Sequence, residues 1–234
     1  MPENAAPMLS HAEAKRYYDR FGKKQDSQEF YEGKAVKALC DRADLEHATS
    51  VIEIGCGTGK LAAELLSDRL PDSARYLGLD VSSTMVELAR ARTAPFGERA
   101  RIVQVDGSLP LPAADASADR FLATYVFDLL SEEEIAAMLS EAHRVLAPGG
   151  LLCVAGITPG PGGFSRFVSG VWTRIQHWRP MLVGGCRPLR LHEHLPEGQW
   201  RIVSCETVTA WGVASEVLVA ATTGPDRRGD TIRE

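Results

Sequence analysis

The stretch VIEIGCGTGK (residues 51–60) decides how the rest of this chain is interpreted. It places a short apolar run directly before three glycines, Gly55, Gly57 and Gly59. Glycine loses more conformational freedom on folding than other residues, so a cluster of it is expected where the backbone turns tightly or is closely approached. The stretch therefore predicts a buried strand that ends in a turn, and it raises the question of what approaches that turn.

Similar apolar runs recur along the chain, with helical patterns between most of them. Buried strands are predicted at 51–54, 75–79, 101–105, 120–126, 151–157, 200–210 and 216–222. Helices are predicted at 10–21, 26–41, 58–68, 83–92 and 131–146. Strands that alternate with helices form βαβ units and hence a parallel sheet. We expect an α/β fold with a doubly wound, mostly parallel seven-stranded sheet, helices on both faces and an antiparallel final strand.

The chain divides into four predicted parts. Residues 1–41 form an N-terminal helical cap, residues 42–157 the ligand-binding core, and residues 158–224 a lid or substrate segment with the closing strands of the same domain. Residues 225–234 are a polar tail that we expect to be disordered.

The predicted lid segment differs from the core in its amino-acid pattern and charge. Apolar residues from Phe164 to Trp178 recur at helical spacing, which predicts an amphipathic helix that covers either the sheet or an apolar substrate. Residues 158–199 also hold five arginines against two acidic residues. The simplest interpretation is that these arginines are solvated surface side chains. The functional interpretation is that they contact an anionic group of the substrate or a membrane surface.

Composition narrows the class of protein. The 234 residues carry a formal net charge of −5, so no global basic field attracts nucleic acid. The five cysteines are scattered without a CxxC pair, which favours a reducing, cytoplasmic location over a disulfide framework or a structural zinc site. We expect neither a secretory signal nor a transmembrane segment, because no apolar run approaches the length of about 18 residues that a bilayer requires.

Three predicted strands end in residues that are suited to binding a ligand: a glycine turn or an aspartate. They are the turn from Glu53 to Gly59, Asp80 after the second strand, and Asp106 after the third. Because the carboxyl ends of parallel strands share one edge, where ligands bind, these groups are expected to meet. Backbone amides of a glycine turn, a carboxylate for two ribose hydroxyls and a carboxylate for an exocyclic amine would together hold a nucleoside.

The glycine spacing fails two phosphate-binding patterns. The dinucleotide fingerprint requires a glycine where Lys60 stands. A P-loop requires a Ser or Thr where Leu61 stands, and a glycine where Ile54 stands.

Four segments in sequence, EIGCGTG, GLDVSSTM, VQVDGSLPLP and HRVLAPGG, resemble those of class I S-adenosylmethionine-dependent methyltransferases. The resemblance is to the small-molecule enzymes similar to the ubiquinone/menaquinone C-methyltransferase family, and it spans residues 51–157. It implies a Rossmann-like fold and S-adenosyl-L-methionine as the cofactor. The glycines would then let the backbone pass close to a sulfonium amino acid, with no pyrophosphate.

The resemblance also implies roles for individual residues. Gly55, Cys56 and Gly57, with the rest of the turn from Glu53 to Gly59, would contact the methionine part of the cofactor. Asp80 would hold the ribose diol.

The adenine and methyl contacts follow in the same way. Val81 and Met85 would sandwich the adenine, and Asp106 would accept from its amino group beside the Gly107 backbone. Tyr125, at the end of the fourth strand, would border the transferred methyl. Tyr18-Asp19 resembles the pair whose N-terminal helix closes over the cofactor in many relatives, and the preceding Tyr17 leaves open which of the two tyrosines acts.

Plainer interpretations stand beside these roles. Asp80 alone is as well explained as a helix cap, Met85 as core filling, and Glu53 as a strand residue paired nearby. Cys186 is better explained as a small buried residue than as a reactive thiol. His192 and His194 show half of a metal site without a third ligand, so we expect a surface pair and no metal.

The leading functional hypothesis is transfer of a methyl group, by in-line displacement, to a small and lipophilic molecule. Alignment of the reactants is the main requirement of such a reaction, so the catalytic residue stays open, with Tyr18, Tyr125 and Asp128 as candidates. The alternatives are an NAD(P)-dependent reductase and a non-catalytic scaffold that binds the cofactor. The acceptor and the oligomeric state stay open, and no nucleic-acid partner is expected.

Overall fold

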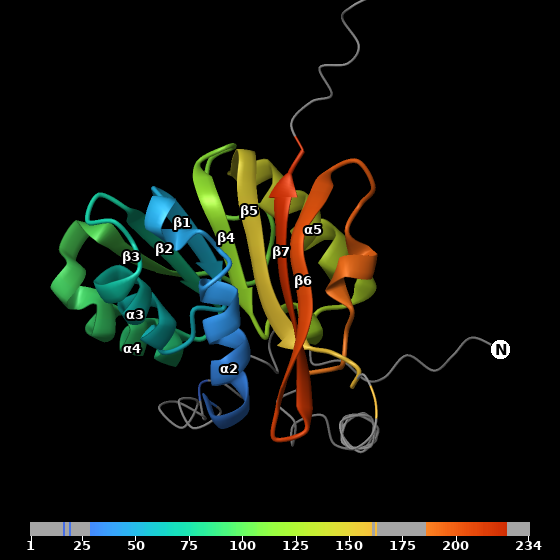
Figure 1. The fold of residues 1–234 in the computed structure, drawn as a ribbon. Coiled ribbons are helices and arrows are strands. Elements are labelled where there is room, and N and C mark those ends of the chain that lie inside the picture. Colours follow the sequence, from blue (N-terminus) through green and yellow to red (C-terminus); the bar gives the residue numbers. More distant parts are fainter. Residues whose placement is uncertain (1–15, 17–18, 20–28, 161, 163–185, 224–234) are drawn as a thin grey trace, which may run out of the picture.

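The computed structural model describes residues 16, 19, 29–160, 162 and 186–223 of the chain. Within this part, one seven-stranded sheet has the order β3-β2-β1-β4-β5-β7-β6 (Figure 1). Its strands are β1 (Ser50–Ile54), β2 (Arg75–Asp80), β3 (Ala100–Gln104), β4 (Ala118–Thr124), β5 (Leu146–Ile157), β6 (Trp200–Ala210) and β7 (Val213–Thr222).

The strand directions are those expected from the βαβ pattern. Strands β1 to β5 pair in parallel, whereas β7 pairs antiparallel with both of its neighbours, β5 and β6. The predicted mostly parallel sheet with an antiparallel final strand is therefore confirmed. Strand β6 lies at one edge and runs in the same direction as β1 to β5.

Within the described ranges, the four α-helices whose bounds are defined cover the two faces of this sheet. They are α2 (Glu29–Cys40), α3 (Lys60–Asp68), α4 (Ser83–Thr93) and α5 (Glu132–Val145). Buried side chains of α2, α3 and α4 share one apolar cluster, which includes Leu39, Leu65 and Val86. Buried side chains of α5, including Ile135 and Leu139, belong to a second cluster on the other face (Figure 1). This distribution confirms the doubly wound arrangement.

Short 3-10 helices complete the described elements. These are η2 (Leu45–His47), η3 (Ala94–Arg99), η4 (Phe127–Leu129) and η6 (Leu191–His194).

Several element ends differ from the predicted ones for local backbone reasons. Helix α3 begins at Lys60 and not at residue 58, because Gly59 lies in the left-handed region with φ +73°. Strand β4 ends at Thr124, before Tyr125, whose φ of +56° leaves the extended conformation. Strand β5 begins already at Leu146, where it pairs with Ala118, so the Pro-Gly-Gly segment after α5 lies inside the strand.

Some predictions concern residues outside the described part of the chain. They include most of the helix at 10–21, of which residues 16 and 19 are described and helical, the amphipathic helix from residue 164 to residue 178, and the tail at 225–234. The division into cap, core, lid and tail stays a prediction. Among the described residues, no helix is both long and apolar enough to cross a bilayer.

Helix α5 begins with the capping box that its sequence predicts. The Ser131 hydroxyl accepts from the Glu134 amide at 3.2 Å, and the Glu134 carboxylate accepts from the Ser131 amide at 2.8 Å, which completes the predicted capping box. We expect Ser131→Ala to lower the free energy of unfolding by about 1 kcal/mol in urea titrations, since an orphan amide loses its acceptor. Ser131→Asp, which restores an acceptor, should recover most of the loss. An equal loss in both variants would contradict the capping role.

Candidate active site

The carboxyl ends of β1, β2 and β3 lie side by side at one edge of the sheet. Strands β1, β2 and β3 are neighbours, and their registers place Ile54 beside Leu79 and Asp80 beside Gln104. The glycine turn that follows β1, Asp80 at the end of β2 and Asp106 just after β3 therefore meet at the carboxyl edge. This is the place where ligands bind in open α/β sheets.

The turn after β1 has a left-handed backbone conformation that is unfavourable for residues other than glycine. Gly55, Gly57 and Gly59 have φ angles of +65°, +52° and +73°. Left-handed conformations are unfavourable for residues with a Cβ atom, which explains a glycine at each position. The Cys56 amide donates to the Leu79 carbonyl at 3.1 Å, so the turn begins as a continuation of the β1–β2 pairing.

The three glycines differ in what a Cβ atom would meet. At Gly55 it would lie 2.5 Å from Cγ2 of Val126, and at Gly59 2.7 Å from Cα of Ala89 in α4. At Gly57 its nearest neighbour would be the Gly55 carbonyl oxygen at 4.0 Å. Gly55 and Gly59 are therefore needed for packing within the protein, whereas the backbone at Gly57 is the part of the turn open to a ligand.

Asp80 connects the turn to the segment after β2. Its Oδ2 accepts from the Gly57 amide at 2.9 Å, and its Oδ1 accepts from the Ser82 amide at 2.8 Å. The side chain is almost fully buried, and this burial raises the pKa of its carboxyl despite those hydrogen bonds. The N-cap of α4 is Ser82 and not Asp80, so the plain helix-cap interpretation of Asp80 does not hold.

Ser82 and Asp19 belong to this region, although the sequence motifs indicated Asp19 only as the neighbour of Tyr18 and did not indicate Ser82. The Ser82 hydroxyl accepts from the Met85 amide at 3.2 Å and donates to Oδ1 of Asp19 at 2.5 Å. The same oxygen of Asp19 accepts from the Thr84 amide at 3.4 Å. Residue 19 of the N-terminal segment therefore lies against the first turn of α4. The available signal was the Tyr18-Asp19 pair, whose tyrosine lies outside the described residues.

Asp106 shapes the loop after β3. Its Oδ1 accepts from both the amide and the hydroxyl of Ser108, at 2.9 and 2.5 Å. Asp106 is exposed, and the next residue, Gly107, has a φ of +88°. The carboxylate of Asp106 is therefore exposed at this turn, in contrast to the buried carboxylate of Asp80.

The remaining residues around Asp80 are more enclosed. Met85 is only 1% exposed, as its core-filling interpretation requires, whereas Val81 is half-buried. Cys56 is buried, and its sulfur lies 3.0 Å from the point where a Cβ of Gly78 would be. The cofactor contacts assigned to these residues stay predictions.

Glu53 lies behind the glycine turn in a buried pair with Tyr76. The Tyr76 hydroxyl donates to Oε2 of Glu53, and both side chains are at most 2% exposed. Burial raises the pKa of the Glu53 carboxyl to about 7, against the opposing effect of the Tyr76 hydrogen bond. This geometry matches the plainer interpretation of Glu53 as a strand residue paired nearby.

Tyr125 lies at the end of β4 and turns toward β7. Its hydroxyl is 2.9 Å from Oγ of Ser215, and its amide donates to the Ala155 carbonyl at 2.7 Å. The side chain is 8% exposed and packs with Ile157 and Cys186. A non-glycine residue at positive φ is uncommon, and such strain tends to occur at functional sites.

Asp128, in η4, is a buried carboxyl near the same strand ends. Its Oδ2 accepts from the Ile157 amide at 3.2 Å, whereas Oδ1 has no hydrogen-bond partner among the described residues. Burial raises the pKa of this carboxyl to about 6, with smaller opposing effects from the Ile157 amide and the Cys186 thiol. Cys186 itself is buried, in line with its interpretation as a small interior residue.

The acidic character of this edge limits the ligands that it can hold. Asp80 and Asp106 are acceptors, and the carboxylate of Asp19 further raises the pKa of Asp80. Carboxylates accept hydrogen bonds from hydroxyl and amino groups, and they disfavour a nearby pyrophosphate. The arrangement suits an uncharged nucleoside with a diol and an amine better than it suits a dinucleotide.

Comparison with known proteins agrees with this geometry. Residues 51–150 match the family model of the methyltransferase domain. A demethylmenaquinone methyltransferase of Thermus thermophilus is 34% identical over 134 residues, 57% of this chain and 58% of the relative. The ubiquinone/menaquinone biosynthesis C-methyltransferase UbiE of Geotalea daltonii is 33% identical over 105 residues, 44% of this chain and 43% of the relative. The chain spans about half the length of the curated relatives that it matches.

Solved structures share the fold at low sequence identity. The cyclase SpnF aligns over 95% of this chain and 100% of its own, with a TM-score of 0.69 and 17% identity. The N-methyltransferase NodS of Bradyrhizobium japonicum, solved with S-adenosyl-L-homocysteine, aligns over 82% of this chain and 87% of its own, with a TM-score of 0.58 and 14% identity.

The sheet order, the glycine turn and the family model matched by residues 51–150 make this chain similar to class I methyltransferases with a Rossmann-like fold. Within that class, the chain is similar to the ubiquinone/menaquinone C-methyltransferase family, as the sequence motifs predicted.

The different surroundings of the glycines yield a first prediction. Gly57→Ala should lower the free energy of unfolding by only about 1–2 kcal/mol, the cost of a left-handed backbone with a Cβ atom. Gly59→Ala should cost more, since its Cβ would also lie 2.7 Å from the α4 backbone and force that helix to shift. Urea denaturation of both variants measures the difference. Equal losses would contradict the packing role of Gly59.

Glu53 yields a second prediction, on pH. Because its native pKa of about 7 is above the reference value of 4.5, the folded state binds this proton more tightly. Its contribution to stability therefore decreases as pH rises through that window and is constant above it. Between pH 4.5 and 7, the stability of Glu53→Gln relative to the wild type should increase by on the order of 3 kcal/mol. A difference that does not change with pH in denaturant titrations would contradict the buried, proton-binding state.

Proposed function

We propose that this protein is an S-adenosyl-L-methionine-dependent methyltransferase that acts on a small, lipophilic acceptor. The observation that carries the proposal is the juxtaposition at one sheet edge of the open backbone at Gly57 with two carboxylates, Asp80 and Asp106. The matched domain supports the reaction class, and the mixed apolar and aromatic character of residues 164–178 supports the lipophilic acceptor.

The residues present fit this cofactor. Gly57 leaves space where a Cβ atom would otherwise stand, and the exposed carboxylate of Asp106 can accept from an amino group. Each oxygen of Asp80 already has one backbone donor, and a carboxylate oxygen can accept a second hydrogen bond from a ribose hydroxyl. We assign the methionine part to the turn from Glu53 to Gly59, the ribose to Asp80, and the adenine to Val81, Met85, Asp106 and Gly107.

When bound, S-adenosylmethionine supplies a methyl group on a sulfonium whose leaving group is a neutral thioether. The chain therefore has to orient the acceptor and exclude water more than it has to stabilise new charge, and orientation of this kind is worth up to ~7–11 kcal/mol. We assign Tyr125, which is held by Ser215 at the end of β4, the role of orienting an acceptor. Tyr18 is assigned the same role on the basis of the family resemblance alone.

A general base is needed only if the acceptor must first lose a proton. Asp128 is a candidate because its Oδ1 has no hydrogen-bond partner within the described part of the chain, and its pKa of about 6 leaves it ionised near neutral pH. At that pKa it is a stronger base than an ordinary aspartate.

The cysteines and the charge of the chain bear on its location and partners. All five cysteines are free thiols, four of them buried, which supports a reducing, cytoplasmic location. The net charge of −5 gives no support to a nucleic-acid acceptor. The arginines of residues 158–199 leave contact with an anionic substrate group or a membrane surface as a further proposal.

Two other functions compete with this one. A nicotinamide-dependent reductase is disfavoured by Lys60 in place of a glycine and by the acidic edge. A non-catalytic cofactor-binding scaffold would retain the same cofactor site and differ only in the absence of methyl transfer. Fold alone does not decide between them.

The proposed contact between Asp106 and the adenine amino group yields a prediction that distinguishes a loss of cofactor recognition from a loss of folding. Asp106→Ala should weaken binding of S-adenosylhomocysteine by roughly tenfold or more, the value of a charge-assisted hydrogen bond. Binding of S-inosylhomocysteine, which lacks the amino group, should be weak in the wild type and unchanged by the substitution. Asp72→Asn, an exposed aspartate at the opposite sheet edge, is the control. An equal loss for both ligands in Asp106→Ala would contradict the amine contact.

The reaction itself is tested by transfer of labelled methyl from S-adenosylmethionine to a panel of phenols and quinols, with bulk transfer RNA in parallel. We expect label in an apolar small molecule and none in the RNA. Label in RNA alone would contradict the small-molecule proposal, and cofactor binding without transfer to any acceptor would favour the scaffold.

A further inference from the structure

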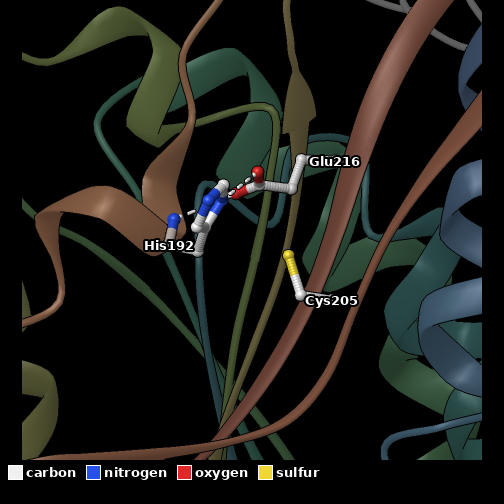
Figure 2. A group of neighbouring side chains, drawn as sticks. All are labelled: His192, Cys205 and Glu216. Carbon is white, nitrogen blue, oxygen red and sulfur yellow. Dashed lines mark hydrogen bonds and ion pairs between the residues drawn. The ribbon is translucent and has the colours of Figure 1, made fainter. Parts of the chain in front are cut away.

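On the β7–β6 side of the sheet, three different donor side chains converge between the last two strands and η6. They are His192 of η6, Cys205 of β6 and Glu216 of β7, and one donor atom from each lies within 4.8 Å of the other two (Figure 2). They are distant in sequence, so a chance run of polar residues does not explain their proximity.

The sheet register places two of the donors on one face. Strands β6 and β7 pair Thr207 with Glu216 and Cys205 with Leu218, so Cys205 and Glu216 are diagonal neighbours. Leu218 belongs to the apolar cluster that includes α5 and η6, which identifies the face. Helix η6 then brings His192 over this pair (Figure 2).

Glu216 and His192 are held together by two hydrogen bonds. The His192 amide donates to Oε1 of Glu216 at 3.1 Å, and Nδ1 of the imidazole lies 2.6 Å from Oε2. The Glu216 side chain is 8% exposed, in a strand whose other residues are almost all buried. A carboxylate in such a place is costly unless a partner compensates its charge.

The third donor is distinctive among the cysteines. Of the five in the chain, Cys205 is the one that is exposed. Its environment does not activate it as a nucleophile, since partial burial and the Glu216 carboxylate both raise the pKa of the thiol. A metal ion, in contrast, displaces the thiol proton directly.

We propose that His192, Cys205 and Glu216 form a three-ligand site for a divalent cation of borderline softness, with Zn²⁺ as the best match. Thiolate, imidazole and carboxylate together are typical zinc ligands, whereas Mg²⁺ and Ca²⁺ prefer oxygen alone. A fourth, solvent position is available because Cys205 faces outward.

The rearrangement that the site requires is small. In a tetrahedral site with bonds of about 2.0–2.1 Å, the nitrogen and oxygen ligand atoms lie about 3.3 Å apart. The Nδ1 to Oε2 distance of 2.6 Å would therefore open by about 0.7 Å as the proton between them leaves. The hydrogen bond from the His192 backbone amide to Oε1 of Glu216 can persist and hold the carboxylate in place.

A second group, Asp44, Glu46 and His47, does not carry the same proposal. All three are exposed and lie within one short segment, and it contains no sulfur donor. The His192 cluster instead joins three elements, so a bound ion would fasten η6 to β6 and β7. Binding to the folded chain should raise its thermal stability.

The test uses the untagged full chain, freed of metal by a chelator and titrated with Zn²⁺ and, as a spectroscopic probe, Co²⁺. We expect one ion per chain, visible absorption typical of tetrahedral Co²⁺ with a thiolate charge-transfer band, and a higher melting temperature with Zn²⁺. Cys205→Ser and Glu216→Gln should each weaken Zn²⁺ binding by roughly a hundredfold, and Cys205→Ser should abolish the charge-transfer band.

His194→Ala is the matched control. His194 lies in the same 3-10 helix, but its Nδ1 pairs with Glu132 at 3.1 Å, so this variant should bind metal like the wild type. Circular dichroism checks that each variant is folded. As a second measurement, Zn²⁺ should protect Cys205 from alkylation by iodoacetamide in the wild type and in His194→Ala. Absence of stoichiometric binding, or binding and protection that survive Glu216→Gln unchanged, would overturn the proposal.

Discussion

The carboxylate of Asp80 is the contact on which the carboxyl edge of this sheet depends. One oxygen receives the Gly57 amide of the turn after β1, and the other receives the Ser82 amide at the start of α4. Two loops from different βαβ units are thereby held in one geometry by a single buried side chain. The energetic cost of that burial is visible in its raised pKa, and the two amide donors offset part of it.

Around this contact, packing and ligand access are divided among neighbouring residues. Gly55 and Gly59 allow Val126 and Ala89 to approach the turn, and Gly57 leaves space in front of it. Asp106 stands exposed one strand further along, whereas Glu53 is enclosed with Tyr76 behind the turn. An acidic, amide-rich edge of this kind is suited to hydroxyl and amino donors, which is the chemical basis for proposing a nucleoside cofactor without a phosphate.

Much of this could be predicted from the sequence because local signals and the global fold agree. Apolar runs predicted all seven strands, the spacing of Ser131 and Glu134 predicted the cap of α5, and parallel pairing placed Asp80 and Asp106 at one edge. Long-range contacts could not be predicted: the Asp19–Ser82 hydrogen bond, the Glu53–Tyr76 pair and the approach of His192 to Cys205 and Glu216 each join distant segments. The start of α3 after Gly59 and the end of β4 before Tyr125 depended on backbone angles that composition does not fix.

The most direct test of the cofactor site is isothermal titration calorimetry of the full chain with S-adenosylmethionine, S-adenosylhomocysteine, NAD and NADP. If the turn at Gly57 and the carboxylates of Asp80 and Asp106 hold a nucleoside without a pyrophosphate, the first two ligands bind at one site per chain and the nicotinamide cofactors give no binding heat. Binding of NAD or NADP, with none of the sulfonium cofactor or its demethylated product, would contradict the assignment of this edge.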